Sequence, residues 1–480
     1  MKVLITHSYF LRFDPKQEKI MQPFPPLGTI YAAKVLRDCG AEVIFYDCMF
    51  EHSEENIFST IDSTQPDLFI ICDDGFNYLT KMCLTNMREA SLKMIEYASK
   101  KNIFSLVASS DSTDHFQKYL TVGASVVFLG EIEQSLKEFY LKFSSNKEWQ
   151  TIDGIAFNSE IGVKKNNKRE VIKNIDELGL PAWDLIDIEL YKSKWKNKNG
   201  YFTLNCATTR GCPYKCNWCA KPIYGNRYNS RSPKLVVEEL KVLVNKFGAT
   251  NIWFCDDIFG LKPNWVKEFA DLIESENLKF DYKIQSRVDL LLQPDFLDDL
   301  KRSGCKTIWV GAESGSQKIL DAMDKGTKVE QIKLACQLMK EKNIEPAFFI
   351  QFGYPGEEWS DIEKTIEMLE DCMPNDIGIS VSYPLPGTKF YEKVKDQLNE
   401  KQNWSHSDDL LLMFRNTYPP EFYRVLHSYV HKRFRKKENI NKVKSYLKEK
   451  KSKIELKNIL LPFYFSIMQS YYKRKLDAFK

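Results

Sequence analysis

The sequence predicts an α/β protein with a doubly wound parallel sheet, then a partial (βα)6 barrel, then a helical, basic C-terminal region. Short apolar runs alternate with helical periods in two separate series along the chain. A proline-punctuated stretch separates the two series, and the last sixty residues contain 17 Lys and Arg against five Asp and Glu. The length of 480 residues is sufficient for two or three domains, each with its own hydrophobic core.

Composition narrows the class of protein. The hydrophobic share of 43% and the charged share of 28% are ordinary for a soluble globular chain. A net charge of +4 gives no general argument for a nucleic-acid partner, and none is expected. The opening MKVLITHSYF is too short an apolar run for a signal peptide, and no stretch reaches the roughly 18 apolar residues of a spanning helix. We therefore expect a cytoplasmic protein without a transmembrane segment, whose 12 cysteines do not form a disulfide framework.

Residues 1–140 contain the first series. Five apolar runs are interpreted as buried strands, and a helical period between the first two ends at Gly40, a residue type typical of helix C-termini. Strands that alternate with helices predict a doubly wound parallel sheet, whose ligands bind at the C-terminal strand ends. Polar or glycine-rich segments follow three of the strands, so this edge is either a ligand site or a set of ordinary turns. The runs are 2–7, 42–47, 67–72, 103–108 and 125–130, and the polar segments are 73–77, 109–115 and 130–135.

Residues 141–200 are interpreted as a connector, and residues 201–395 contain the second series. Six strand candidates are too few for an eight-fold barrel, so we predict a partial barrel with its site at the C-terminal strand ends. Residues 396–480 are predicted to be helical, as a solvated cap over the barrel or as a contact with an anionic substrate or a membrane surface. The six candidates are 202–209, 251–257, 280–286, 306–313, 346–353 and 376–383.

Three cysteines are clustered in the loop after the first strand of the second series. Cys212, Cys216 and Cys219 have the spacing C-x3-C-x2-C, and Cys206 lies upstream, within the strand itself. A structural zinc ion requires four ligands, usually in two close pairs. A [4Fe–4S] cluster held by three thiolates has one open iron, which can bind a substrate or a cofactor. The spacing favours the cluster, while a zinc site and the absence of a metal remain alternatives.

The segment CPYKCNWC resembles the signature of the radical S-adenosylmethionine (SAM) superfamily, with Trp218 in the aromatic position. The resemblance implies that SAM binds the open iron and that one electron from the cluster cleaves it to methionine and a 5′-deoxyadenosyl radical. It also implies a low-potential electron donor, such as flavodoxin or ferredoxin. The cofactors then carry the difficult chemistry, and the protein positions them and excludes water.

The strand ends of the second series resemble the SAM contacts of the same superfamily. The resemblance implies that the SAM amine meets Asp256 or Asp257, although FCDDIF departs from the usual Gly-Gly-Glu segment. It places Arg287 near the SAM carboxylate or a phosphate-like group, and Glu313 near the ribose hydroxyls. A purely structural role remains open for these carboxylates, since an acidic residue before a helix often caps it.

The last two strand ends resemble the same family. The segment FGYPGEE resembles the glycine-containing loop beneath the adenine, which implies that Gly353 and Glu357 lie close to SAM. The segment SYPLPGT at 382–388 resembles a proline-rich rim of one branch of the superfamily.

The five-strand series before the barrel resembles the cobalamin (B12)-binding domain of one radical SAM branch. Together with the barrel, this resemblance covers about residues 1–395. The motif Asp-x-His-x-x-Gly, which supplies a cobalt-ligating His in other B12 domains, does not occur, so we expect cobalamin without a His axial ligand. The residues implied to contact it are Pro26, Leu27, Gly28, Asp74, Gly75, Ser109, Ser110, Asp111, Gly130 and Glu131.

The function implied by the resemblance is that of a cobalamin-dependent radical SAM enzyme that methylates an unactivated carbon of a small molecule, a lipid or a peptide. Oxidative ring formation, as in the anaerobic porphyrin cyclase, is an alternative that the sequence does not separate from methylation. A cobalamin- or redox-responsive binding protein without enzymatic activity is an alternative of another class. Sulfur insertion is not favoured, because the cysteines of the first series lack cluster-like spacing.

Overall fold

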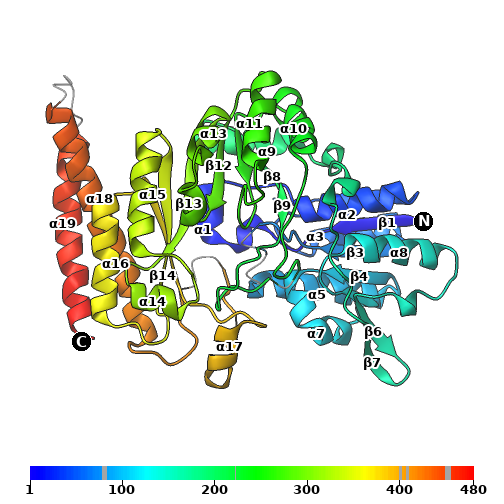
Figure 1. Ribbon diagram of the computed structural model, residues 1–480. Helices are drawn as coiled ribbons and strands as arrows, with labels where there is room; N and C mark the ends of the chain where they lie inside the picture. Colours follow the sequence, from blue (N-terminus) through cyan, green and yellow to red (C-terminus); the bar gives the residue numbers. More distant parts are fainter. Residues whose placement is uncertain are drawn as a thin grey trace.

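The computed structural model spans residues 1–480 and describes all of them except 78, 79, 81–83, 222, 399–402, 407–409, 449–455 and 480. Several of these lie in the C-terminal region predicted from residue 396 onward. The two predicted sheets are present and lie side by side, the first to the right and the second towards the left in Figure 1. A helical hairpin forms the left edge of the molecule.

The first sheet has the parallel order β2-β1-β3-β4-β5, which is the doubly wound arrangement that the sequence predicts. Alternate side chains along β1 point to opposite faces, so Val3 and Ile5 share a core with α2 and α8, whereas Leu4 shares one with α3 and α5. Helix α2 ends at Asp38, and Gly40 follows with φ +85°, as predicted. The elements are β1 (Lys2–Thr6), η1 (Leu11–Phe13), α1 (Pro15–Ile20), α2 (Leu27–Asp38), β2 (Glu42–Tyr46), α3 (Asn56–Thr64), β3 (Leu68–Cys72), α5 (Thr85–Lys100), β4 (Phe104–Ala108), α6 (Ser110–Asp114), α7 (Phe116–Thr121), β5 (Val126–Phe128) and α8 (Glu133–Ser144).

An antiparallel hairpin extends this sheet beyond residue 140. Its first strand pairs with β5, so the first sheet has seven strands. The sequence interpretation places this segment in a connector, but Ile155 and Phe157 pack into the core beneath the sheet, which makes the hairpin part of the first unit. The elements up to residue 199 are η2 (Trp149–Thr151), β6 (Ile155–Ser159), β7 (Gly162–Lys165), η3 (Ile175–Leu178), η4 (Trp183–Leu185) and α9 (Ile188–Asn199).

The second sheet is a partial barrel of six parallel strands in the order β8-β11-β12-β13-β14-β15. Its first and last strands do not pair with each other, so the barrel is open, as the sequence predicts. Its strands are β8 (Thr203–Cys206), β11 (Asn251–Phe254), β12 (Asp281–Ser286), β13 (Cys305–Glu313), β14 (Glu345–Phe352) and β15 (Asp376–Val381), with the two-residue pair β9 (Thr209–Arg210) and β10 (Asn229–Ser230). Its helices are α10 (Pro233–Lys241), η5 (Val242–Lys246), α11 (Trp265–Ser275), α12 (Val288–Leu291), α13 (Phe296–Arg302), α14 (Gln317–Ala322), α15 (Val329–Glu341) and α16 (Trp359–Cys372).

The C-terminal region begins with α17 (Lys389–Val394) and η6 (Lys395–Gln397) and ends with two long helices, α18 (Pro420–Lys448) and α19 (Leu456–Asp477). Helix α18 packs against α16 and β15 of the barrel, and α19 packs on α18. Among the described residues, no helix combines the length and the apolar character needed to cross a membrane.

Candidate functional site

The three cysteines of the motif lie on the loop between β9 and β10, at the C-terminal ends of the barrel strands. Cys212 is buried, and Cys216 and Cys219 are half-buried. Burial and the nearby Asp257 carboxylate raise the pKa of Cys219 to about 12, and burial also raises the pKa of Cys212. The charge of Cys216 also raises the pKa of both thiols, so the three cysteines lie close enough to interact electrostatically.

This donor set fits an iron–sulfur cluster. Among the described residues, no three His, Cys, Asp or Glu side chains converge as they would on a single metal ion. A [4Fe–4S] cluster instead binds each thiolate to a different iron, which three cysteines on one loop can supply. Cys206 faces another way, because its sulfur lies 3.9 Å from Arg231 Nη1 and the side chain is fully buried. The cluster ligands predicted from the sequence remain a prediction that this placement supports.

Asn217 anchors the cysteine loop to the barrel. Its side-chain amide donates to the carbonyl of Ala322 at 2.6 Å and accepts from the Tyr354 hydroxyl at 2.8 Å, while its backbone N–H donates to Met323 at 3.1 Å. The adjacent Trp218 is half-buried, and its indole N–H has no hydrogen-bond partner in the described structure. The loop is therefore held in place on one side and retains an unused donor.

The two aspartates after β11 have different surroundings. Asp256 is buried and accepts hydrogen bonds from both backbone N–H groups of Thr208 and Thr209, at 2.7 and 2.8 Å, and from the Thr208 hydroxyl at 2.5 Å. Burial raises the pKa of Asp256 to about 6. Asp257 is half-buried, and its charge reaches Cys212 and Cys219. Asp256 thus fixes the turn before the cysteine loop, and Asp257 is the aspartate whose charge acts on two of the cysteines.

Arg287 follows β12 and Glu313 ends β13, and the two residues belong to one network of paired charges. The Arg287 guanidinium stacks 3.7 Å above the centre of the Tyr214 ring, binds Asp289 at 2.9 Å and donates to the carbonyl of Lys325. The ammonium of Lys325 in turn lies 2.8 Å from Glu313. Both arginine and glutamate are buried, so this set ties the cysteine loop, which contains Tyr214, to two strand ends.

Gly353 and Glu357 form a closed loop after β14. Gly353 has φ +76°, which only glycine adopts easily, and its N–H donates to Glu357 at 2.6 Å. Its carbonyl accepts from Asn416 at 2.7 Å, so the segment before α18 is fastened to this loop. Glu357 is fully buried with one carboxyl oxygen unpaired, and burial raises its pKa to about 8.

A small, partly open cavity of about 30 Å³ lies at the C-terminal edge of the first sheet. Five of the residues predicted to contact cobalamin line it, and the other five do not. Asp111, for example, is used within the protein, since it accepts hydrogen bonds from Arg88 and from the Tyr119 hydroxyl. The five that line the cavity are Gly28, Gly75, Ser109, Gly130 and Glu131, and the five that do not are Pro26, Leu27, Asp74, Ser110 and Asp111.

The wall of this cavity includes residues of the barrel unit. Ile223 and Tyr224, which follow the cysteine loop, close the cavity opposite the first sheet. The Cβ of an alanine at Gly75 would lie 3.4 Å from the Tyr224 hydroxyl, so Gly75 and Tyr224 are within ordinary contact range of each other. The cysteine loop and the cavity are therefore neighbours across the boundary between the two units.

Arg210 joins the two units at the same place. It stands two residues before Cys212 and pairs with Glu131 at 2.5 Å and Glu133 at 2.6 Å, both of which line the cavity. All three side chains are no more than 5% exposed. Although burial opposes its charge, the glutamates raise the pKa of Arg210 well above its ordinary value. Three aromatic rings surround the guanidinium carbon at 5.3–5.5 Å: Tyr31, Phe76 and Tyr224.

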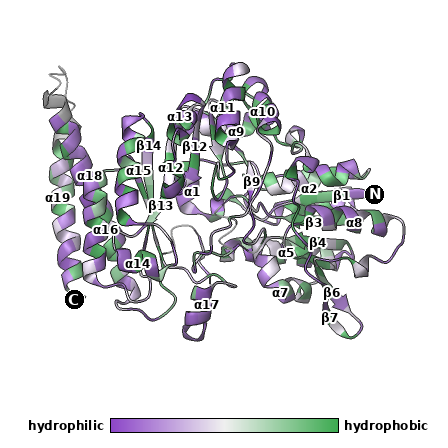
Figure 2. Ribbon diagram, viewed as in Figure 1, coloured by the Kyte–Doolittle hydropathy of each residue, from purple (hydrophilic) through white to green (hydrophobic). Residues whose placement is uncertain are grey.

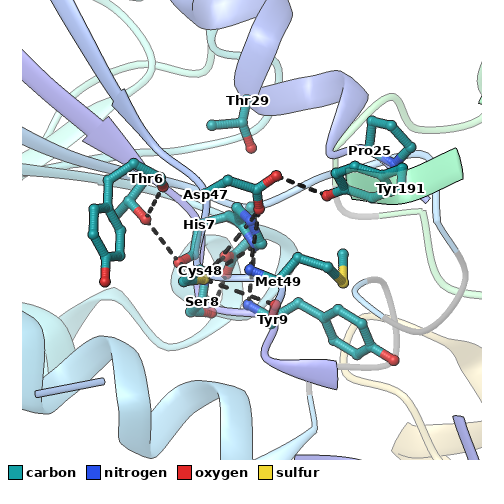
Figure 3. A network of polar contacts seen from close by, with 12 residues as sticks. Thr6, His7, Ser8, Tyr9, Pro25, Thr29, Asp47, Cys48, Met49 and Tyr191 are labelled. Atoms are coloured by element: carbon teal, nitrogen blue, oxygen red, sulfur yellow. Dashed lines mark hydrogen bonds and ion pairs between the residues drawn. The ribbon is translucent and has the colours of Figure 1, made fainter. Parts of the chain in front are cut away.

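His7 lies in a second buried network, after β1. Figure 3 shows its ring beside Asp47 and Cys48, with Asp47 also bound by the Tyr191 hydroxyl of α9 at 2.8 Å. His7 Nε2 lies 2.9 Å from Asp47, and Nδ1 lies 3.5 Å from the Cys48 sulfur and accepts from the Tyr9 backbone N–H at 3.3 Å. Burial opposes protonation, yet Cys48 and Asp47 raise the pKa of His7 well above its ordinary value. Both ring nitrogens are thus engaged by protein groups.

Together these features define a class: a partial βα barrel with three cysteines at its open rim, preceded by a doubly wound sheet with a cavity at the shared boundary. Residues 207–369 match the model of the radical SAM superfamily, so this part of the chain is a radical SAM enzyme domain. The hypothesis of a non-enzymatic binding protein is therefore set aside.

Particular relatives extend over most of the chain. An uncharacterized methyltransferase of Pyrococcus horikoshii is 26% identical, and the match covers 79% of this chain and 81% of that protein. An anaerobic magnesium-protoporphyrin IX monomethyl ester cyclase of Rubrivivax gelatinosus is 24% identical, over 84% and 72% of the two chains. The solved structure of OxsB, a cobalamin-dependent SAM radical enzyme with aqua-cobalamin bound, has a TM-score of 0.75 at 17% identity, over 98% and 72%. These likenesses confirm the fold of both units.

The sequence motifs do not identify several residues that the structure places at the site. Lys325 lies between strands, and Arg210 precedes the motif without belonging to it. Asn217 is within the motif, but at a position that the spacing does not specify. A buried charge has no sequence signal of its own, because its partner is distant in the chain.

Proposed function

We propose that this enzyme is a cobalamin-dependent radical SAM methyltransferase that acts on an unactivated carbon. The observation that carries the proposal is the shared wall: Tyr224 and Ile223, just after the cysteine loop, close the cavity of the first sheet. A cofactor in that cavity would lie beside the cysteine loop. The methyltransferase relative and the cobalamin named for OxsB support the same assignment.

The residues present fit two of the groups that this function requires, the cluster and SAM. Cys212, Cys216 and Cys219 would hold a [4Fe–4S] cluster, and Asp257, the aspartate on the side of the cysteines, would accept from the SAM amine. The chemistry supplied by these groups, when bound, is reductive cleavage of SAM to a carbon-centred radical and delivery of a methyl group. A low-potential donor such as flavodoxin or ferredoxin would provide the electron.

The chain's own contribution is positioning and exclusion of water. Asp256 holds the turn at Thr208 and Thr209 that leads into the cysteine loop. The glycine at 353 lets the loop after β14 close against the segment that precedes α18, through Asn416. These contacts surround the rim with buried groups, and a dry, rigid rim protects reactive species from side reactions.

The residues predicted to contact SAM would have two roles, direct contact with the ligand and positioning of other residues. Trp218 offers an unused indole N–H to a ligand, whereas both backbone groups of Gly353 are already engaged by Glu357 and Asn416, so Gly353 would shape the loop. Arg287 and Glu313 are already paired in the protein and would act through Lys325 and Asp289, as positioning residues.

A second candidate is oxidative ring formation. It is supported by the cyclase relative, whose match covers 84% of this chain, a larger share than the 79% of the methyltransferase match. Both reactions would begin with hydrogen abstraction from a carbon, so the residues described above do not separate them.

Anaerobic reconstitution tests the proposal. The wild-type chain should bind about four irons, take up hydroxocobalamin one to one without an imidazole ligand, and release 5′-deoxyadenosine from SAM with dithionite. The Cys212→Ala, Cys216→Ala and Cys219→Ala variants should each lose SAM cleavage, and Cys206→Ala should retain the iron. With methyl-labelled SAM and cell extract as the substrate source, label should enter a small molecule, lipid or peptide. Cleavage without cobalamin uptake would refute the cobalamin assignment, and a product without label would favour the cyclase.

A further inference from the structure

The last helix, α19, presents an unusually apolar surface. It lies at the outer edge of the molecule and packs on α18, and Figure 2 shows apolar and hydrophilic residues interleaved along it. Of the thirteen large apolar side chains that stay exposed among the described residues, five belong to this one helix, with exposed fractions from 47% to 70%. These five, here called the α19 stripe, are Leu460, Phe463, Tyr464, Ile467 and Tyr471.

The spacing of the α19 stripe makes it continuous. Steps of three and four residues keep all five side chains within a band about 100° wide, which runs about 17 Å along the helix. The other side of α19 faces the protein: Leu476 is fully buried and Tyr472 packs against the barrel core, as does Phe479 just after the helix. The stripe is therefore the outward face of a docked helix, and not part of the packing that holds the helix in place.

Cations border the α19 stripe. Arg474 and Lys475 are exposed and continue the same face one turn beyond Tyr471. The Lys475 ammonium lies 4.7 Å from the Tyr471 ring, and Lys432 of α18 lies 5.4 Å from the Tyr464 ring. Two carboxylates of the hairpin, Glu438 and Asp477, are paired with other lysines, Lys442 and Lys473.

Positive charge is concentrated in the C-terminal part of the chain, which contains the α19 stripe. Residues 421–480 contain 17 Lys and Arg against five Asp and Glu, whereas residues 1–420 contain 52 against 60. The C-terminal hairpin is thus a basic unit on an acidic body, although the net charge of the chain is only +4. An overall charge near zero conceals a local potential that attracts anions.

We propose that the α19 stripe binds the surface of a membrane that contains anionic lipids. Aromatic and aliphatic side chains on one face, with Lys and Arg beside them, are the composition of helices that lie in the interfacial plane of a bilayer. Tyr and Phe are suited to the headgroup level, and flanking cations pair with lipid phosphates. A second copy of the chain fits less well, because two such faces would bring their cations together. This inference does not depend on the proposed reaction.

Vesicle co-sedimentation with the full-length protein tests the proposal. The protein should bind vesicles of phosphatidylcholine with about 30% phosphatidylglycerol, a composition of about one anionic lipid in three, and bind pure phosphatidylcholine far less. Raising the salt to about 1 M should weaken binding, since charges are then screened beyond about 3 Å. Phe463→Gln with Ile467→Gln should lower the partition coefficient at least about tenfold, and Arg474→Gln with Lys475→Gln should lower it on anionic vesicles only.

A matched control uses two exposed apolar residues elsewhere. Leu141 is 48% exposed and Ile161 is 98% exposed, both in the first unit, so Leu141→Gln with Ile161→Gln should leave vesicle binding unchanged. All these positions are surface sites, and circular dichroism should show unchanged helix content. Absence of binding to anionic vesicles, or equal loss in the control, would overturn the proposal. So would light scattering that shows a dimer lost only in Phe463→Gln with Ile467→Gln, because the stripe would then be a self-association surface.

Discussion

Replacement of Arg210 by methionine should destabilise the protein strongly, because it leaves two buried carboxylates without their cation. The guanidinium binds Glu131 and Glu133 at 2.5 and 2.6 Å, and each side chain is no more than 5% exposed. Removal of one partner from a buried ion pair typically costs about 3–5 kcal/mol. Methionine keeps much of the apolar stem, so most of the loss comes from the unpaired charges. We expect a decrease of this size in the free energy of unfolding.

The decrease should be recoverable. In Arg210→Met with Glu131→Gln and Glu133→Gln, no buried charge of this group remains unpaired. The amide oxygen introduced by Glu131→Gln can still accept from the backbone N–H of Ile172, which now binds the Glu131 carboxylate. Replacement of a whole buried ionic group by neutral side chains is often nearly neutral, so the triple variant should return to within about 2 kcal/mol of wild type. The non-additivity between the single and triple variants measures the coupling.

The assay is urea unfolding of the metal-free protein under reducing conditions, followed by tryptophan fluorescence. Arg302 is the control, since it also meets carboxylates, Asp271, Glu274 and Asp299, but at the surface, with 27% of its side chain exposed. Arg302→Met should cost less than about 1 kcal/mol. The reasoning is refuted if Arg210→Met costs no more than this control, or if the triple variant is no more stable than Arg210→Met.

Two further predictions concern the barrel rim. Because the pKa of Glu357 is raised to about 8, the folded protein keeps this proton at pH values where the unfolded chain releases it, so the free energy of unfolding should fall as pH rises between about 4.5 and 8. Glu357→Gln should remove this decline, which is a gain on the order of 3 kcal/mol relative to wild type between about pH 5 and pH 8 in urea unfolding. Parallel pH profiles for the two proteins would contradict this reasoning. Asp256→Asn should lower the free energy of unfolding by about 1–3 kcal/mol, because the carboxylate accepts three hydrogen bonds. Asp257→Asn should instead preserve stability and weaken SAM binding, measured by calorimetry. The reverse pattern would assign the SAM contact to Asp256.

Much of this architecture follows from the sequence because its signals are local. Apolar runs of fixed length with helical periods between them identify both sheets, and the spacing of Cys212, Cys216 and Cys219 identifies the loop that bears them. The hairpin at 155–165 is recognisable as two strands, but its assignment to the first sheet depends on pairing with β5. Pairing partners are not encoded within a strand of five residues.

The tertiary structure alone decided which groups each polar side chain meets. Asp256 and Asp257 are adjacent and chemically identical, yet only the fold places one against the backbone of Thr208 and the other toward the cysteines. Arg210 is an ordinary arginine in the sequence, and it becomes the junction between the two units because two glutamates from the first sheet are buried with it. Periodicity follows from the geometry of one helix or strand, whereas a buried charge is determined by partners that only folding brings within a few ångströms.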